Sequence, residues 1–129
     1  VHVQALVLLA RSIAPSMPTG GRIIAIGSRT SSGAAAKSLY AASKAAVTAL
    51  IRSWAIELAP RGITANVIAP AATSTAMVHD PSRTVAPIVP PIGRYIEPDE
   101  IAAYAEFLLS PEAGAITGQE LLICGGASL

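Results

Sequence analysis

Charged residues are scarce in this chain, and the few that occur almost cancel. Asp, Glu, Lys and Arg make up 13% of the residues and the net charge is +1, whereas soluble domains typically contain about 25% charged residues. Without a basic cluster, the chain is not expected to bind nucleic acid. Its single cysteine, Cys124, excludes an internal disulfide and permits a reducing compartment, so we expect a cytoplasmic protein.

Long apolar runs are also missing, although 52% of the residues are hydrophobic and the mean hydropathy is +0.54. A membrane-spanning helix needs about 20 predominantly apolar residues, and His2, Gln4, Arg11 and Ser12 interrupt the richest stretch. We therefore expect no membrane insertion. We expect instead that other protein covers much of the apolar surface, either a missing part of the same core or partner subunits in a homo-oligomer such as a dimer or tetramer.

A third absence is the glycine-rich loop that cradles phosphates in dinucleotide-binding domains. No such loop precedes the first predicted strand, and the chain begins at Val1, inside a predicted helix. These features predict a partial domain. No cluster of ligating side chains predicts a metal site.

Helical and extended patterns alternate along the chain. Apolar spacing predicts helices, and short β-branched runs without strict alternation predict strands buried on both faces. The predicted helices cover 1–17, 38–59 and 98–109, and the predicted strands cover 22–27, 63–69 and 119–124. This order is typical of a parallel sheet with helical crossovers.

A long segment rich in Pro, Ser and Thr, residues 71–97, separates the second predicted strand from the third helix. It reads as a loop with room for one short helix. Loops of this length in compact domains are often functional lids, so we predict that 71–97 is a substrate lid.

The chemistry is carried by three residues around the first predicted strand: Ser28 at its end, then Tyr40 and Lys44 in Tyr40-Ala41-Ala42-Ser43-Lys44. On a helix, Tyr40 and Lys44 share one face. An ammonium about 4 Å from a phenolate stabilises it by roughly 4 kcal/mol at a dielectric near 20, so Tyr40 could exchange a proton with an alcohol or ketone oxygen. Taken singly, these residues are more often a turn hydroxyl, a half-buried ring and a solvated charge.

The segments GGRIIAIGS, YAASKAAV, ELAPRGITANVIAP, PDEIA and AITGQELLICGGASL together resemble the short-chain dehydrogenase/reductase family over essentially the whole chain. The resemblance implies the C-terminal half of a doubly wound parallel-sheet, Rossmann-like α/β domain, with the N-terminal dinucleotide-binding half absent. Residues 1–129 would then form part of a single domain, its catalytic and substrate-binding half.

The resemblance also implies an oxidoreductase that transfers a hydride between NAD or NADP and a small-molecule secondary alcohol or ketone. In that reading Ser28 orients the substrate and Tyr40 is the catalytic acid/base. Lys44 assists Tyr40 and, with it, contacts the nicotinamide ribose.

By the same resemblance, the segment after the second strand lines the nicotinamide, and its contact residues are Pro70, Ala71, Thr73 and Thr75. The chain departs from the family pattern at several points. Ala71 stands where a glycine is usual, and His2 where an asparagine usually completes a proton relay.

Two alternative functions remain open. One is a halohydrin dehalogenase-like lyase, which shares this fold and a Ser/Tyr pair but carries arginine at the position of Lys44. The other is a non-enzymatic fragment that lacks the cofactor-binding half.

Overall fold

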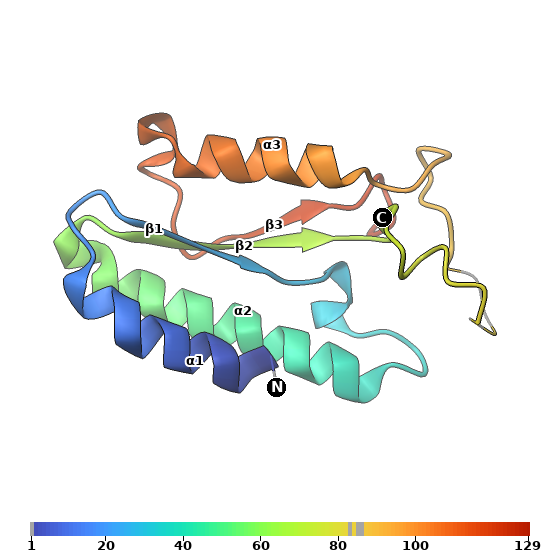
Figure 1. The fold of residues 1–129 in the computed structure, drawn as a ribbon, viewed down its shortest axis with the longest axis horizontal. Helices are drawn as coiled ribbons and strands as arrows, with labels where there is room; N and C mark the ends of the chain where they lie inside the picture. Colours follow the sequence, from blue (N-terminus) through green and yellow to red (C-terminus); the bar gives the residue numbers. More distant parts are fainter. Residues whose placement is uncertain (1, 83, 85–86) are drawn as a thin grey trace.

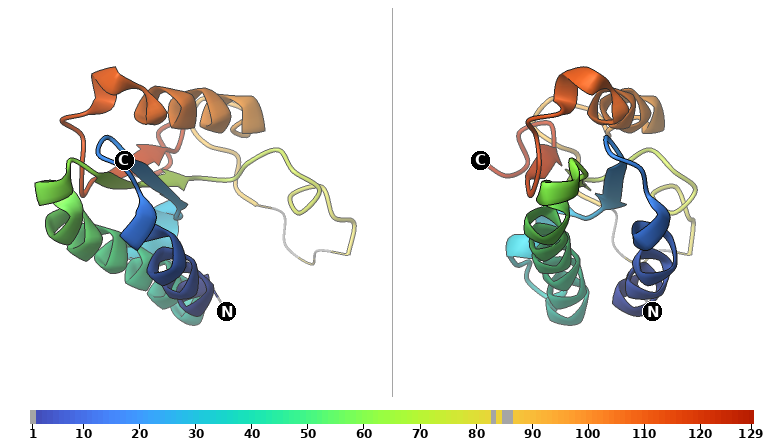
Figure 2. Two further views of the ribbon diagram at one scale, coloured as in Figure 1. Left: turned by 60° about the vertical axis from the view of Figure 1, so that its left-hand side comes forward. Right: turned by 90° about the vertical axis from the view of Figure 1, so that its left-hand side faces the viewer.

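The computed structural model describes residues 2–82, 84 and 87–129. Its centre is a sheet of three parallel strands in the order β1-β2-β3. Helices α1 and α2 cover one face of this sheet and α3 covers the other (Figures 1 and 2). The elements in chain order are α1 (His2–Ile13), β1 (Arg22–Ile26), α2 (Ser38–Leu58), β2 (Thr64–Pro70), α3 (Pro98–Leu109) and β3 (Glu120–Ile123). The predicted α/β alternation is confirmed.

The ends of the helices follow from local chemistry. Helix α3 begins at Pro98 as predicted, where a proline tolerates the first helical position and the Glu100 carboxylate accepts the backbone N–H of Glu97 at 2.8 Å. Helix α1 is shorter than predicted. It ends at Ile13 and passes into a single 3₁₀ turn, because Pro15 has no N–H to continue the helical bonding.

Strand β2 lies in the middle of the sheet and is buried from Thr64 to Ala69. It pairs in parallel with β1, where Ile24 lies opposite Asn66, and with β3, where Val67 lies opposite Glu120. A strand with neighbours on both edges and helices on both faces is expected to be largely apolar, and the buried part of β2 is apolar apart from Thr64 and Asn66.

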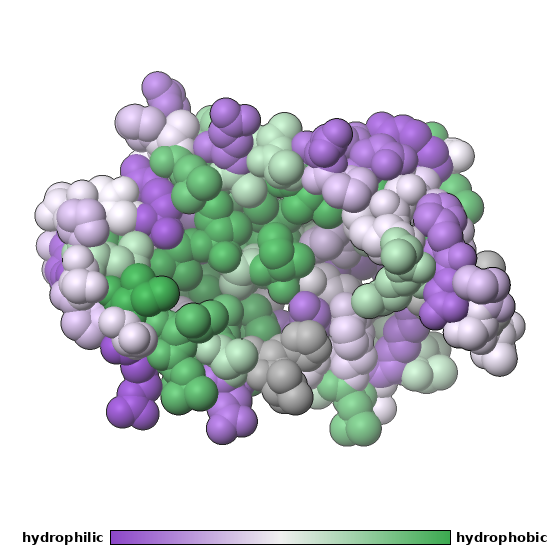
Figure 3. All heavy atoms as spheres, viewed as in Figure 1, coloured by the Kyte–Doolittle hydropathy of each residue, from purple (hydrophilic) through white to green (hydrophobic). Residues whose placement is uncertain are grey.

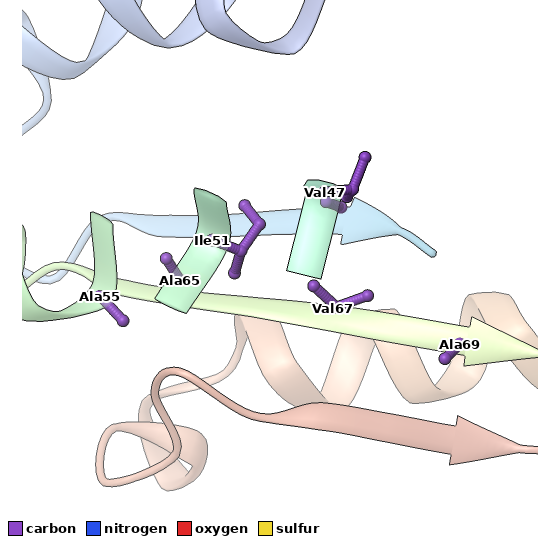
Figure 4. Packing of buried hydrophobic residues seen from close by; sticks show 7 residues of the cluster. Val47, Ile51, Ala55, Ala65, Val67 and Ala69 are labelled. Atoms are coloured by element: carbon purple, nitrogen blue, oxygen red, sulfur yellow. The ribbon is translucent and has the colours of Figure 1, made fainter. Parts of the chain in front are cut away.

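The main core lies between α2 and the sheet. Val47, Ile51 and Ala55 of α2 lie over Ala65, Val67 and Ala69 of β2 (Figure 4). Alanine in both layers lets the helix approach the strand closely. A second cluster of Ile68, Leu108 and Ala113 lies on the opposite face, under α3. The two clusters fix α2 and α3 to the same central strand.

The face that carries β1 is strongly apolar. Among the described strands, β1 pairs with β2 alone, so its other edge is an exposed edge of the sheet. Figure 3 shows apolar side chains gathered across this face, between α1 and α3. Leu9, Ile13 and Ile26 are each more than half exposed. In the described part of the chain, no helix has the length and apolar character required to cross a membrane.

Replacing Ile51 by Ala should lower the free energy of unfolding by about 2–5 kcal/mol, because Ile51 is completely buried and its truncation leaves a cavity. Ile56→Ala on the same helix is the matched control, since the Ile56 side chain is 78% exposed. Chemical denaturation measures both values. Equal losses in the two variants would contradict the described orientation of α2.

Candidate functional site

The residues with candidate chemical roles meet at the carboxyl edge of the sheet. Ser28 follows the end of β1, Ala71 follows the end of β2, and Lys44 on α2 reaches the last residue of β1. Ligands of open parallel sheets bind outside the carboxyl ends of the strands. The fold therefore places these residues where a substrate or cofactor would be expected.

Lys44 is a nearly buried cation, with only 8% of its surface exposed. Its ammonium Nζ donates to the carbonyl oxygen of Ile26 at 3.0 Å. A buried charge needs partners that replace water, and this carbonyl is one of them. An ammonium carries three N–H donors, so a second acceptor can be bound beside the end of β1.

Tyr40 lies one turn before Lys44 on α2, as the spacing predicts. The Lys44 Nζ is 5.9 Å from the centroid of the Tyr40 ring, within the range of a cation–π contact. Tyr40 is 46% exposed, so a large part of this residue is open to solvent. The two residues form a phenol beside a positive charge that the protein largely shields from solvent.

Ser28 is held in a tight turn after β1. Its Oγ accepts the backbone N–H of Thr30 at 3.2 Å and lies 2.9 Å from the Thr30 hydroxyl. Both side chains are buried. This bond caps a single 3₁₀ turn, η2 (Arg29–Ser32). Thr30 is a site residue that sequence reasoning missed, because nothing in the sequence distinguishes it from its polar neighbours.

Gly27 allows β1 to approach β2 closely just before Ser28. Its N–H donates to the Ile68 carbonyl at 2.8 Å. A Cβ added at Gly27 would lie 2.5 Å from Cγ1 of Val67, a residue of the main core. A side chain at this position would push Ser28 away from the sheet edge.

The segment after β2 begins at the same edge. Pro70 is the last residue of β2, and the Ala71 N–H donates to the Ile123 carbonyl at the end of β3 at 3.0 Å. The hydroxyls of Thr73 and Thr75 donate to the carbonyls of Ala71 and Thr73, at 3.0 and 3.4 Å. These four predicted cofactor contacts are therefore close together at the end of β2, while no described contact joins them directly to Tyr40.

The loop 71–97 is closed at its base. Thr73 and Ile96 form a parallel bridge, and the Ser74 N–H donates to the Ile96 carbonyl at 2.8 Å. No helix occurs in the described part of this loop. Residues 83, 85 and 86, which fall within the predicted lid, lie outside the described residues.

The C-terminal end of this loop is tied to α3. Arg94 donates to both carboxylate oxygens of Glu100, at 2.7 and 2.9 Å. The hydrogen bond from Arg94 is the main cause, and the one from the Glu97 N–H the second, of a pKa of Glu100 lowered to about 2. Glu100 therefore stays ionised in the physiological range, and the ion pair joins the end of the loop to the first turn of α3.

Comparison with known proteins relates this architecture to a large family. The family model described as Enoyl-(Acyl carrier protein) reductase matches residues 1–128. Dehydrogenase OXI1 of Cochliobolus heterostrophus is 37% identical over all of this chain and 60% of its own length. The 3-oxoacyl-[acyl-carrier-protein] reductase FabG of Vibrio cholerae is 44% identical over 82% of this chain and 45% of its own length.

A solved structure agrees with these matches in fold as well as in sequence. A short-chain dehydrogenase from Burkholderia cenocepacia in complex with NADP superposes with a TM-score of 0.87 and 34% identity, over 100% of this chain and 54% of its own. The chain belongs to the short-chain dehydrogenase/reductase family. It spans about half the length of the family members it matches.

Family membership confirms the resemblance drawn from the sequence motifs and the Rossmann-like fold class. The proteins matched are dehydrogenases and reductases, so the comparisons do not favour a halohydrin dehalogenase-like lyase. The side chain of His2, which stands where the family usually has the asparagine of a proton relay, lies outside the described part of the structure. No group of three or more His, Cys, Asp or Glu residues among those described is placed to hold a metal ion.

Proposed function

We propose that the protein carrying this chain is an oxidoreductase that transfers a hydride between NAD or NADP and a secondary alcohol or ketone, with Tyr40 as the acid/base. One observation carries the proposal. The buried Lys44 ammonium is bonded to the end of β1 and lies beside the accessible phenol of Tyr40. This pairing supports a proton exchange by the phenol at the carboxyl edge of the sheet, where ligands of open parallel sheets bind.

In the direction of ketone reduction, the Tyr40 hydroxyl gives its proton to the carbonyl oxygen as the carbonyl carbon becomes a carbinol carbon. Lys44 stabilises the phenolate that remains, because its ammonium is shielded from water and its charge is little screened. In alcohol oxidation the phenolate takes the hydroxyl proton. The net proton movement is between substrate oxygen and Tyr40 Oη in both directions.

Ser28 would orient the same substrate oxygen. The Thr30 N–H points at Ser28 Oγ, and the Thr30 hydroxyl is within bonding distance of it. When the Thr30 hydroxyl is also the donor, the Ser28 hydroxyl proton is left for the substrate. Thr30 would therefore set the direction of the Ser28 hydroxyl.

The residues present fit the nicotinamide end of such a cofactor. When bound, the nicotinamide accepts or supplies the hydride. Lys44 has donors beyond the one bonded to Ile26, and a ribose hydroxyl is a suitable acceptor for them. Pro70, Ala71, Thr73 and Thr75 would line the nicotinamide from the end of β2. The relative from Burkholderia was solved with NADP, which supports a dinucleotide of this class.

The pyrophosphate end of the cofactor would be held by a dinucleotide-binding half that continues the sheet along β1. The unpaired edge of β1 and the apolar face around it support this arrangement. Activity is thus expected of the longer protein. Its assembly as a homo-oligomer and its cytoplasmic location stay predictions.

Replacing Tyr40 by Phe should reduce turnover by about 100- to 10,000-fold, because the ring is kept while the exchangeable proton is lost. The measurement is the rate of NAD(P)H oxidation with a ketone, in the longer protein that contains this chain. Tyr104→Phe is the matched control, since Tyr104 lies on α3 and packs against the second core cluster. Near-normal turnover of the Tyr40 variant would rule out the proposed acid/base role.

The loop 71–97 is proposed to close over cofactor and substrate. Amide exchange in its exposed described part should be fast in the free protein and at least tenfold slower with a dinucleotide and a substrate analogue bound. The Ser74 and Ile96 amides are an internal control, because both bond across the base of the loop and should be protected in either state. If ligands leave exchange in the exposed part unchanged, the loop is a static wall rather than a lid.

A further inference from the structure

Glu120 opens β3 and joins two elements that are far apart in the sequence. Its Oε1 accepts the Ser31 hydroxyl at 2.6 Å and the Thr48 hydroxyl at 3.0 Å. All three side chains are partly buried. Partial burial of a carboxylate costs free energy unless hydrogen bonds replace its contacts with water. Hydrogen bonds to charged groups are among the stronger ones.

The first partner, Ser31, belongs to the η2 turn that holds Ser28. The Ser31 N–H donates to the Ser28 carbonyl at 2.9 Å, and Ser28 Oγ is bonded to Thr30 in the same turn. Glu120 therefore contacts this turn through the Ser31 side chain.

The second partner, Thr48, lies one helical turn after Lys44 on α2. Its hydroxyl is 3.0 Å from Glu120 Oε1 and 3.3 Å from the Lys44 carbonyl oxygen. One carboxylate oxygen thus contacts both the turn that carries Ser28 and the helix that carries Tyr40 and Lys44.

The segment that connects η2 to α2 does little to hold the two elements in a fixed arrangement. Between η2 and α2, residues 33–37 are largely exposed, and Gly33 and Ala36 have positive φ angles of 115° and 58°. An alanine in the left-handed region is a strained position. The distance between Ser28 and Tyr40 must therefore be set by contacts across the fold rather than by this connection.

We propose that Glu120 is a positioning residue for the reaction, which holds the Ser28 turn in register with the Tyr40–Lys44 helix. The proposal rests on the proposed oxidoreductase function for its kinetic consequences. Its structural part, the tie that Glu120 forms between η2 and α2, depends only on the hydrogen bonds from Ser31 and Thr48 to Glu120.

The kinetic test compares Glu120→Ala, Glu120→Gln and Glu57→Ala in the longer protein. Misplacement of a substrate-orienting group costs up to about 100-fold in rate, so E120A should lower kcat by about 10- to 100-fold with little change in KM for the dinucleotide. E120Q keeps a side-chain oxygen that accepts both hydroxyls and should recover most of the rate. Glu57 is exposed on α2 and E57A should behave as the unmodified protein.

The Ser28→Ala background separates positioning from general damage. If Glu120 acts through Ser28, E120A should cost little further rate when the Ser28 hydroxyl is already absent. The same fold-loss in both backgrounds would overturn the positioning role.

A second measurement does not depend on activity. E120A should speed amide exchange at Ser31 and Gly33, whose N–H groups bond within η2, while E120Q should not. If the longer protein proves inactive but this pattern holds, the proposed function fails and the tie stands. If E120A leaves η2 exchange unchanged, the tie itself is wrong, whatever the activity.

Discussion

The hydrogen bond from the Lys44 ammonium to the Ile26 carbonyl joins helix α2 to the carboxyl edge of the sheet. It keeps the charge of Lys44, a residue that is only 8% exposed, in a position where water screens its effect on neighbouring groups little. The position of Tyr40 follows, because it lies one turn away on the same helix. The closeness of α2 to the sheet depends in turn on the small residues of the main core, Ala55, Ala65 and Ala69.

Much of the fold could be predicted because short stretches of sequence determine where its helices and strands begin and which strand is buried. Pro98, Asp99 and Glu100 place a helix start with proline and acids in the first turn, and α3 begins there. The stretch from Thr64 to Ala69, which is apolar apart from Thr64 and Asn66, is buried as expected for a central parallel strand. Boundaries set by a single proline, as at Pro15, were missed by a few residues because periodicity alone does not register a missing N–H.

The candidate site could be predicted only in part. Tyr40 and Lys44 are related by helical spacing, which is visible in the sequence. The Ser28–Thr30 turn and the Glu120 contacts are not, since Glu120 meets partners 89 and 72 residues away. Contacts of this range depend on the pairing of β3 with β2, in which Glu120 lies opposite Val67. The one available signal was a charged residue at the start of an otherwise apolar strand.

We propose that this edge of the sheet carries a site for reversible hydride transfer coupled to a proton from Tyr40. The most direct test is to incubate the longer protein with NADH or NADPH that carries deuterium at both positions of the nicotinamide C4, together with a set of small neutral ketones, and to locate the label by mass spectrometry. Hydride transfer from the nicotinamide should place one deuterium at the carbinol carbon of the alcohol formed. Absence of reaction with both dinucleotides, or an alcohol without deuterium at that carbon, would contradict it.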